Sequence, residues 1–249
     1  MKVDLPTPVS TEEIKIDVRE IEGILSSPPM KLPVWPGAQV KLPDGRMLYI
    51  RAIQDSDIKP VLGYLERVMK VEKDFYDIVG VRVYGEVLAL VRKRLKDPFT
   101  FVGLVDGEWL GFANGRVWDK DVAVSLHTLT FSRRAKLGWP MYYAKTYYAM
   151  EMVKVQEWWS TFESYNGWRM AGLSMAQPTK PWPQYQHELG GAKIFYVNQD
   201  TWQGRLKDYC KQIIGDDLVR NRRGDFLQRR SRDDAGADQL CIRQGPARA

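Results

Sequence analysis

The chain has 249 residues, of which 44% are hydrophobic and 27% charged, and its formal net charge at neutral pH is +6. This composition excludes collagen-like, low-complexity and disulfide-stapled proteins, and the length suits one domain with extensions. Cys210 and Cys241 form neither a C-x-x-C pair nor a zinc-type spacing, so we expect a reducing, cytoplasmic setting. No apolar run reaches the roughly 18 residues of a membrane span, and we expect no membrane partner.

The first 45 residues have the character of an extension. Ser10 to Glu13 forms a capping box, and apolar residues follow at helical spacing as far as Leu25. The next segment, SSPPMKLPVWPG, has too many prolines for a regular element and should lie extended over a surface. We expect such a helix to dock on its own domain or on a partner.

The elements expected next are strands and helices in alternation. VKLPDGRMLYIRAI predicts two strands around a Pro-Asp-Gly turn, and a helix over 58–69 capped by Asp55 or Asp57 follows. A second helix is expected over 84–95. Asp106-Gly107, between FTFVGLV and EWLGFANGRVW, is the clearest hairpin signal. VAVSLHTLTF alternates between two faces and predicts a third antiparallel strand, with His127, Ser125 and Leu129 on one face.

The second half of the chain continues with a basic loop, SRRAKLG, and a long helix entered through Trp139-Pro140. We expect a further strand in WRMAGLSMA, a short helix in PWPQYQHELG and a last strand in AKIFYVN. A closing helix is expected over 202–218. Beyond Arg220 the tail is polar and charged, and should have little structure of its own.

This order of elements resembles that of the GNAT superfamily, the acyl-CoA-dependent N-acetyltransferases. Three local matches support the resemblance: Ile50-Arg51-Ala52 leading to Asp57, the hairpin FVGLVDGEWLGFANGRV, and the run from His187 to Lys193. The resemblance covers roughly residues 46–200. It implies an α/β (α+β) fold, a GNAT-like mixed and strongly twisted sheet flanked by helices, with N- and C-terminal extensions. The division expected is an N-terminal helix and proline-rich extension (1–45), a GNAT-like domain (46–203), and a C-terminal helix and basic tail (204–249).

The family binds the pyrophosphate of coenzyme A in an Arg/Gln-x-x-Gly-x-Gly/Ala loop, where backbone N–H groups at a helix start surround the anion. The corresponding run here is Arg133-Arg134-Ala135-Lys136-Leu137-Gly138. The resemblance implies acetyl-CoA or another acyl-CoA as cofactor, held by Arg133, Arg134, Lys136 and Gly138, with loss of the cofactor as the alternative. Lys136 replaces the first glycine, which costs about 1 kcal/mol if the backbone there needs a positive φ. A solvated basic turn is the alternative.

An N-acetyltransferase needs a base for the attacking amine and often an acid for the leaving thiolate. His127, on the central strand, is the candidate base, with a structural histidine as the alternative. The family often places a tyrosine acid on the late helix. Alignment on Leu189-Gly190 puts Gln186 there and Tyr185 one residue away, so Tyr185 is the candidate acid. We expect no metal site, because no paired His or suitable carboxylate cluster occurs.

Three function classes follow. The first is an N-acyltransferase moving an acetyl or acyl group from acyl-CoA to a primary amine. The second is a catalytically degenerate GNAT-fold subunit with a structural or interaction role, its protein partner held through the terminal extensions. The third, nucleic-acid binding, depends only on the net charge and on the arginine-rich tail from Arg220 to Arg232, and we expect it least.

Overall fold

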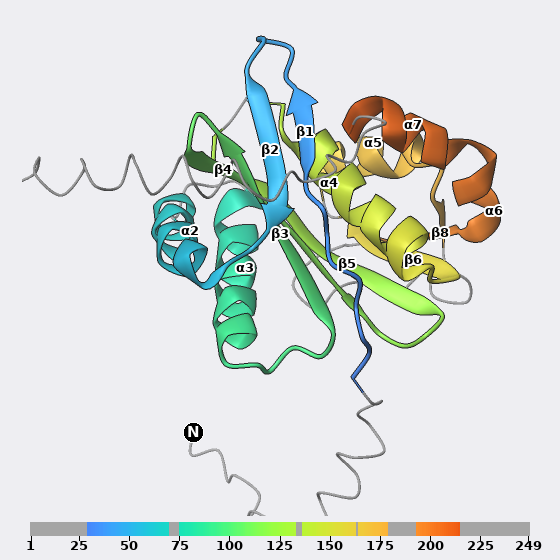
Figure 1. Ribbon diagram of the computed structural model, residues 1–249, viewed down its shortest axis with the longest axis horizontal. Coiled ribbons are helices and arrows are strands. Elements are labelled where there is room, and N and C mark those ends of the chain that lie inside the picture. Colours follow the sequence, from blue (N-terminus) through green and yellow to red (C-terminus); the bar gives the residue numbers. More distant parts are fainter. Residues whose placement is uncertain (1–28, 70–74, 133–135, 163, 179–192, 215–249) are drawn as a thin grey trace, which may run out of the picture.

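The computed structural model describes residues 29–69, 75–132, 136–162, 164–178 and 193–214 (Figure 1). The strands are β1 (Ala38–Lys41), β2 (Met47–Ala52), β3 (Pro98–Val105), β4 (Glu108–Val117), β5 (Val122–Thr130), β6 (Glu157–Phe162), β7 (Gln177–Pro178) and β8 (Lys193–Asn198). The helices are α2 (Asp55–Val68), α3 (Phe75–Val91), α4 (Gly138–Tyr147) with its π-helical continuation η1 (Tyr148–Val153), α5 (Tyr165–Leu173), α6 (Gln199–Thr201), η2 (Trp202–Leu206) and α7 (Lys207–Ile214). Within these ranges no helix is both long enough and apolar enough to cross a bilayer.

All the strands belong to one mixed sheet in the order β1-β2-β3-β4-β5-β6-β8-β7. β1 to β5 are sequential antiparallel neighbours, β5 and β6 are parallel, and the remaining pairs are antiparallel. The hairpin predicted at Asp106-Gly107 forms, with φ values of 51° and 83° that a tight hairpin turn requires. This is the mixed, twisted sheet flanked by helices that the GNAT resemblance implies, and the fold prediction is confirmed.

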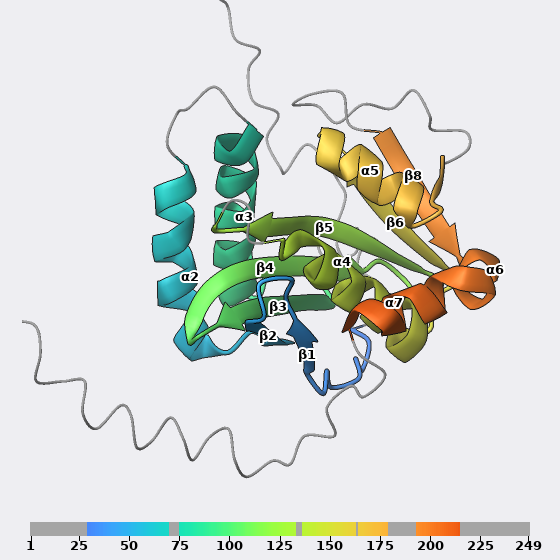
Figure 2. The same ribbon diagram turned by 90° about the horizontal axis from the view of Figure 1, so that it is seen from above.

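Two hydrophobic cores cover the two faces of the sheet, beneath helices that lie on opposite sides of it (Figure 2). On one face, Val61 and Leu65 of α2 and Val83 and Val87 of α3 pack on apolar residues of β3, β4 and β5. On the other face, the larger core joins α4, η1 and α7 to the sheet. The central strands are therefore buried on both sides, and any ligand site between them lies deep in the molecule.

The proline-rich segment before β1 belongs to the larger core. Trp35 is buried and donates from its ring N–H to the carbonyl of Ile50 at 3.1 Å, and the Tyr148 hydroxyl donates to the carbonyl of Pro33 at 2.7 Å. At the other end, Cys210 of α7 is buried in the same core. The described parts of both predicted extensions therefore pack in the core of the sheet. These parts fold with the sheet because their aromatic and aliphatic side chains complete its core.

Two predictions about single elements are wrong, one in the second half of the chain and one at the start of α2. WRMAGLSMA was expected to be a strand, but Tyr165–Leu173 forms α5, whose N-cap Ser164 accepts a hydrogen bond from the N–H of Gly167 at 3.1 Å. The strand is instead β6, EWWSTF, whose burial alternates along its length. At the start of α2 the N-cap is Gln54, not Asp55 or Asp57, and the Asp57 carboxylate accepts from the Gln54 N–H at 2.8 Å.

β5 and β6 pair for only part of their length. Val122–Ser125 align with Glu157–Ser160, and beyond these residues the two strands diverge (Figure 2). The remainder of β5 stays paired to β4 on its other side. This divergence opens a gap in the middle of the sheet.

Candidate active site

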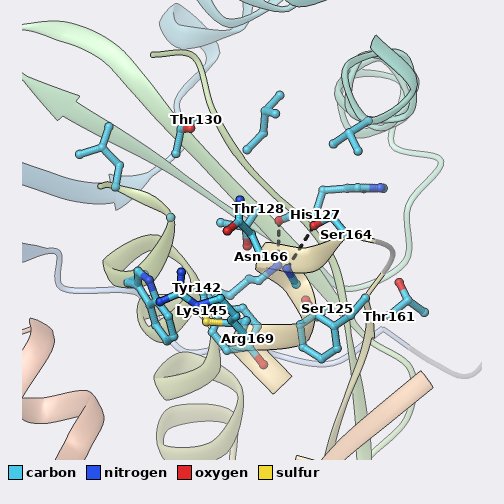
Figure 3. A pocket seen from close by; sticks show the side chains of 18 of the residues that line it. Ser125, His127, Thr128, Thr130, Tyr142, Lys145, Thr161, Ser164, Asn166 and Arg169 are labelled. Carbon is cyan, nitrogen blue, oxygen red and sulfur yellow. Dashed lines mark hydrogen bonds between the residues drawn. The ribbon is translucent and has the colours of Figure 1, made fainter. Parts of the chain in front are cut away.

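A cavity of about 530 Å³ lies where β5 and β6 separate (Figure 3). Its walls come from β5, the end of β6, the start of α4, α5, and Val79 of α3. Because α3 and α4 cover opposite faces of the sheet, the cavity connects the two faces through the gap.

The start of α4 forms one end of this cavity. Lys136, Leu137 and Gly138 line it, and the helix begins at Gly138 as the sequence predicts. The first N–H groups of an α-helix have no intrahelical partner, and the N-cap Leu137 supplies no side-chain hydrogen bond. Lys136 has φ 56°, so the residue at the family's first glycine position does require the left-handed region. A Cβ built on Gly138 meets nothing within 4 Å, which shows that open space lies over this residue.

His127 lies in the wall of the cavity and is bonded to a carboxylate across the sheet. Its Nδ1 is 2.9 Å from Oε1 and 3.0 Å from Oε2 of Glu86, which α3 supplies. Since a carboxylate only accepts hydrogen bonds, Nδ1 carries the proton and Nε2 is the acceptor in the neutral ring. No partner for Nε2 is found in the described part of the chain. The pair has the arrangement of a base and the group that orients it.

Lys145 lies beneath the same strand, on the α4 side (Figure 3). Its side chain is 1% exposed, and its Nζ donates to the carbonyl of His127 at 2.7 Å and to that of Asn114 at 3.2 Å. Burial lowers the pKa of Lys145 to about 7, against the opposing effect of the Glu86 charge. Near neutral pH this amine is therefore partly uncharged.

The walls of the cavity suit an anionic, hydrogen-bonding ligand. None of the described lining residues is acidic, whereas Lys136, His127, Lys145 and Arg169 supply basic groups from four different places. The hydroxyl of Thr128 is buried there without a partner in the described structure. An unpaired buried hydroxyl favours a ligand or water that completes its hydrogen bond. These features, with the open space over Gly138, fit an acyl-CoA. Within the described ranges no cluster of His, Cys, Asp or Glu is arranged to hold a metal ion.

The residues predicted from the sequence are only partly brought together. His127, Lys136 and Gly138 line one cavity. Arg133, Arg134 and Tyr185 lie outside the described residues, as does the short helix expected in PWPQYQHELG. On α5, the helix that follows β6, the tyrosine is Tyr165, at the first position and 78% exposed.

Sequence reasoning missed Glu86, Asn114 and Lys145. Glu86 is 41 residues from His127 in the chain and Lys145 is 18 residues away, so no local spacing connects them. The sequence did offer one indication that Lys145 is buried. It lies beside the apolar stripe of a helix and directly follows Tyr142, Tyr143 and Ala144, which are all buried.

Comparison with solved structures gives similar folds at low sequence identity, and no family model and no curated sequence matches the chain. An uncharacterised protein from Bacillus halodurans matches with a TM-score of 0.51 and 11% identity, over 72% of this chain and 99% of that one. The GNAT domain of a PAT protein from S. lividans gives 0.47 and 14%, over 68% and 99% of the two chains. RimJ from Mycobacterium smegmatis, in complex with CoA-disulfide, gives 0.49 and 14%, over 68% and 91%. At these identities the likeness concerns the fold alone.

Proposed function

We propose that the protein is an N-acyltransferase that moves an acyl group from acyl-CoA to a primary amine in the gap between β5 and β6. The observation that carries this proposal is that His127, whose ring is bonded to Glu86, and the start of α4 line one cavity. A base with an oriented ring and an anion-binding helix start are the two parts that such a transfer requires.

The cofactor would be held by Lys136 and by the free N–H groups at the start of α4, beside Gly138. Arg133 and Arg134 precede these residues in the chain and are included in the proposal on sequence alone. When bound, acyl-CoA supplies the acyl group as a thioester. The remaining lining residues, with Thr128 and Arg169 among them, exclude water and offer hydrogen bonds to the ligand.

His127 would act as the general base. Its unpartnered Nε2 removes a proton from the attacking ammonium or amine, and Glu86 stabilises the imidazolium that forms. Because Glu86 holds the ring through Nδ1, it is a positioning residue. The acid that protonates the leaving thiolate is proposed to be Tyr185, as the alignment with the family suggests.

Acetyl-CoA calorimetry tests the cofactor site. Gly138→Leu places a side chain in open space, so it should leave the fold intact and lower the affinity at least about tenfold by occupying the ligand's place. Gly85→Leu is the matched control, because Gly85 is also helical and a Cβ there also meets nothing within 4 Å. A wild-type protein without affinity for acetyl-CoA, or unchanged binding in Gly138→Leu, would contradict the proposal.

Acyl transfer to a panel of primary amines tests the base. His127→Gln and Glu86→Gln should lower kcat about 100-fold while the affinity for acetyl-CoA stays the same, since neither residue lies at the start of α4. A histidine with only a structural role predicts instead that turnover falls no further than the folded fraction of the variant.

A second candidate function is that of an interaction subunit with a GNAT fold, and the outer face of α3 favours it. Val81 is 58% exposed, Val91 53% and Ile78 38%, on a helix that also buries Val83 and Val87. Apolar side chains that are exposed on a folded protein as a patch mark an interaction surface. Light scattering of Val81→Lys tests this candidate: a smaller assembly with unchanged acetyl-CoA binding would support it, and an unchanged mass would count against it.

A further inference from the structure

The side chain of Lys145 is buried in the centre of the molecule, and the acyl-transfer chemistry does not use it. Its Nζ donates to the main chain, to the carbonyls of His127 and Asn114. It extends from α4, on the face of the sheet opposite to α3 and Glu86. Burying an amine costs folding free energy, so we expect its contacts to have a structural or functional role.

The two carbonyls belong to an interruption of the β4–β5 ladder. Ala113 pairs with Thr128 and Gly115 with Ser125, so Asn114 on β4 faces two residues, Leu126 and His127, on β5. This is a β-bulge, with one extra residue in β5.

The bulge changes the face to which the side chains of β5 point. Ala123 packs in the α4 core and Leu129 in the α2–α3 core. Six residues apart in a regular strand, these two side chains would share a face. The expectation that His127 shares a face with Ser125 as well as Leu129 therefore fails, because the bulge lies between them. His127 is on the α3 face, where Glu86 is.

Side chains replace the missing ladder bonds. The N–H of His127 donates to Oδ1 of Asn114 at 2.8 Å, and Nδ2 of Asn114 donates to Oε2 of Glu86 at 2.6 Å. Glu86 in turn accepts from the His127 ring. Lys145 completes the network by donating to the carbonyl of His127 in the bulge and to that of Asn114 opposite it.

We propose that Lys145 is a positioning residue: by holding the carbonyls of His127 and Asn114 it maintains the bulge that turns the His127 ring toward Glu86 and the cavity. Without the Lys145 amine these two carbonyls lose their hydrogen bonds, and regular pairing of β4 with β5 would restore partners for them. Regular pairing requires a shift of one residue, which moves every later side chain of the strand to the other face. The inference deepens the proposed function and rests on it for its catalytic meaning.

Imidazole NMR provides a test that needs no substrate. The chain has two histidines, His127 and His187, so His187→Gln assigns the spectrum. In wild type the His127 ring should be protonated at Nδ1, with a slowly exchanging proton bonded to Glu86. In Lys145→Met that proton signal should be lost, and the chemical shifts of the two ring nitrogens should average because the ring exchanges between its two tautomers. Lys120→Met is the control, because Lys120 is 86% exposed and the same chemical change there should leave the ring unaffected.

Lys145→Gln provides a second variant that retains one donor. The glutamine amide can still donate to one of the two carbonyls. The His127 ring should therefore keep its Nδ1 proton, which should exchange with water at least about tenfold faster than in the wild type. If Lys145→Met fails to fold, this variant decides the question. A wild-type Nδ1 signal in either folded variant of Lys145 would overturn the inference. Failure of acetyl-CoA to bind the wild-type protein would overturn the proposed function and leave this result as it stands.

Discussion

Replacing Lys145 by methionine should change how the stability of the protein depends on pH. Burial lowers the pKa of this lysine from 10.5 to about 7 in the folded protein. Between these two values the unfolded chain binds the proton more strongly than the folded one. The free energy of unfolding of the wild type therefore rises as the pH increases from about 7 toward 10.5, because the cost of burying the charge is relieved.

The size of this effect follows from the difference between the two pKa values. A pKa that falls from 10.5 to about 7 corresponds to about 5 kcal/mol in the free energy of unfolding. The side chain is 1% exposed, so solvent screening does not reduce this figure much. The variant lacks the charge at every pH, and it also loses two hydrogen bonds to carbonyls, worth about 0.5–1.5 kcal/mol each. Below pH 7 the loss of the buried charge stabilises the variant, whereas the loss of the hydrogen bonds destabilises it. Above pH 9 the wild-type lysine is uncharged as well, so only the loss of the hydrogen bonds remains and the wild type should be clearly the more stable.

Urea unfolding of wild type, Lys145→Met and Lys120→Met between pH 6 and pH 10 measures this. The stability of the wild type relative to Lys145→Met should increase by several kcal/mol over that interval, while its stability relative to Lys120→Met should stay constant. A difference between wild type and Lys145→Met that does not change with pH would refute the reasoning, because it would show that Lys145 keeps its ordinary pKa.

Three other predictions concern the fold. Burial would raise the pKa of the Asp57 carboxyl, but hydrogen bonds from Arg51 and two N–H groups hold it below its usual value. Asp57 should thus stabilise the protein above about pH 4. Asp57→Asn should cost about 3–5 kcal/mol in urea unfolding at pH 7 and less at pH 3. Gly115→Ala should lower stability by about 1–3 kcal/mol, since its Cβ would lie 2.5 Å from the Phe99 ring; an unchanged melting temperature would contradict this. Burial raises the pKa of the Cys210 thiol, which should react with a thiol reagent no faster than the protein unfolds.

Local signals predicted the first half of the fold well. The Asp106-Gly107 turn is a property of two adjacent residues, and it fixed the pairing of β3 with β4. The second half was predicted less well because the decisive signals were weak. β6 has six residues, is separated from η1 only by residues 154–156, and carries the buried polar Ser160 where an apolar residue would have marked the strand. Ser164, which caps α5, was the available evidence against a strand there.

The candidate site shows where sequence reasoning stops. His127 could be selected by residue type, and Gly138 by its place in a loop. The network around them combines side chains from α3, β4, β5 and α4, and the bulge that assembles it leaves no trace in an alternating strand. Alternation of polar and apolar residues predicts a regular strand. The bulge lies where the buried Asn114 and Lys145 make hydrogen bonds to β5, which the alternation does not reveal.

The divergence of β5 and β6 gives this sheet an edge in its interior. Among the described residues, Thr128, Leu129 and Thr130 of β5 pair with β4 on one side and have no strand on the other. An unpaired edge normally lies at the periphery, where it attracts another extended chain. Here this edge faces a cavity, so an elongated ligand with amide groups could pair with it as a further strand would. Binding should therefore slow hydrogen exchange most in the middle of the sheet, in a strand that by its position would be expected to be protected already.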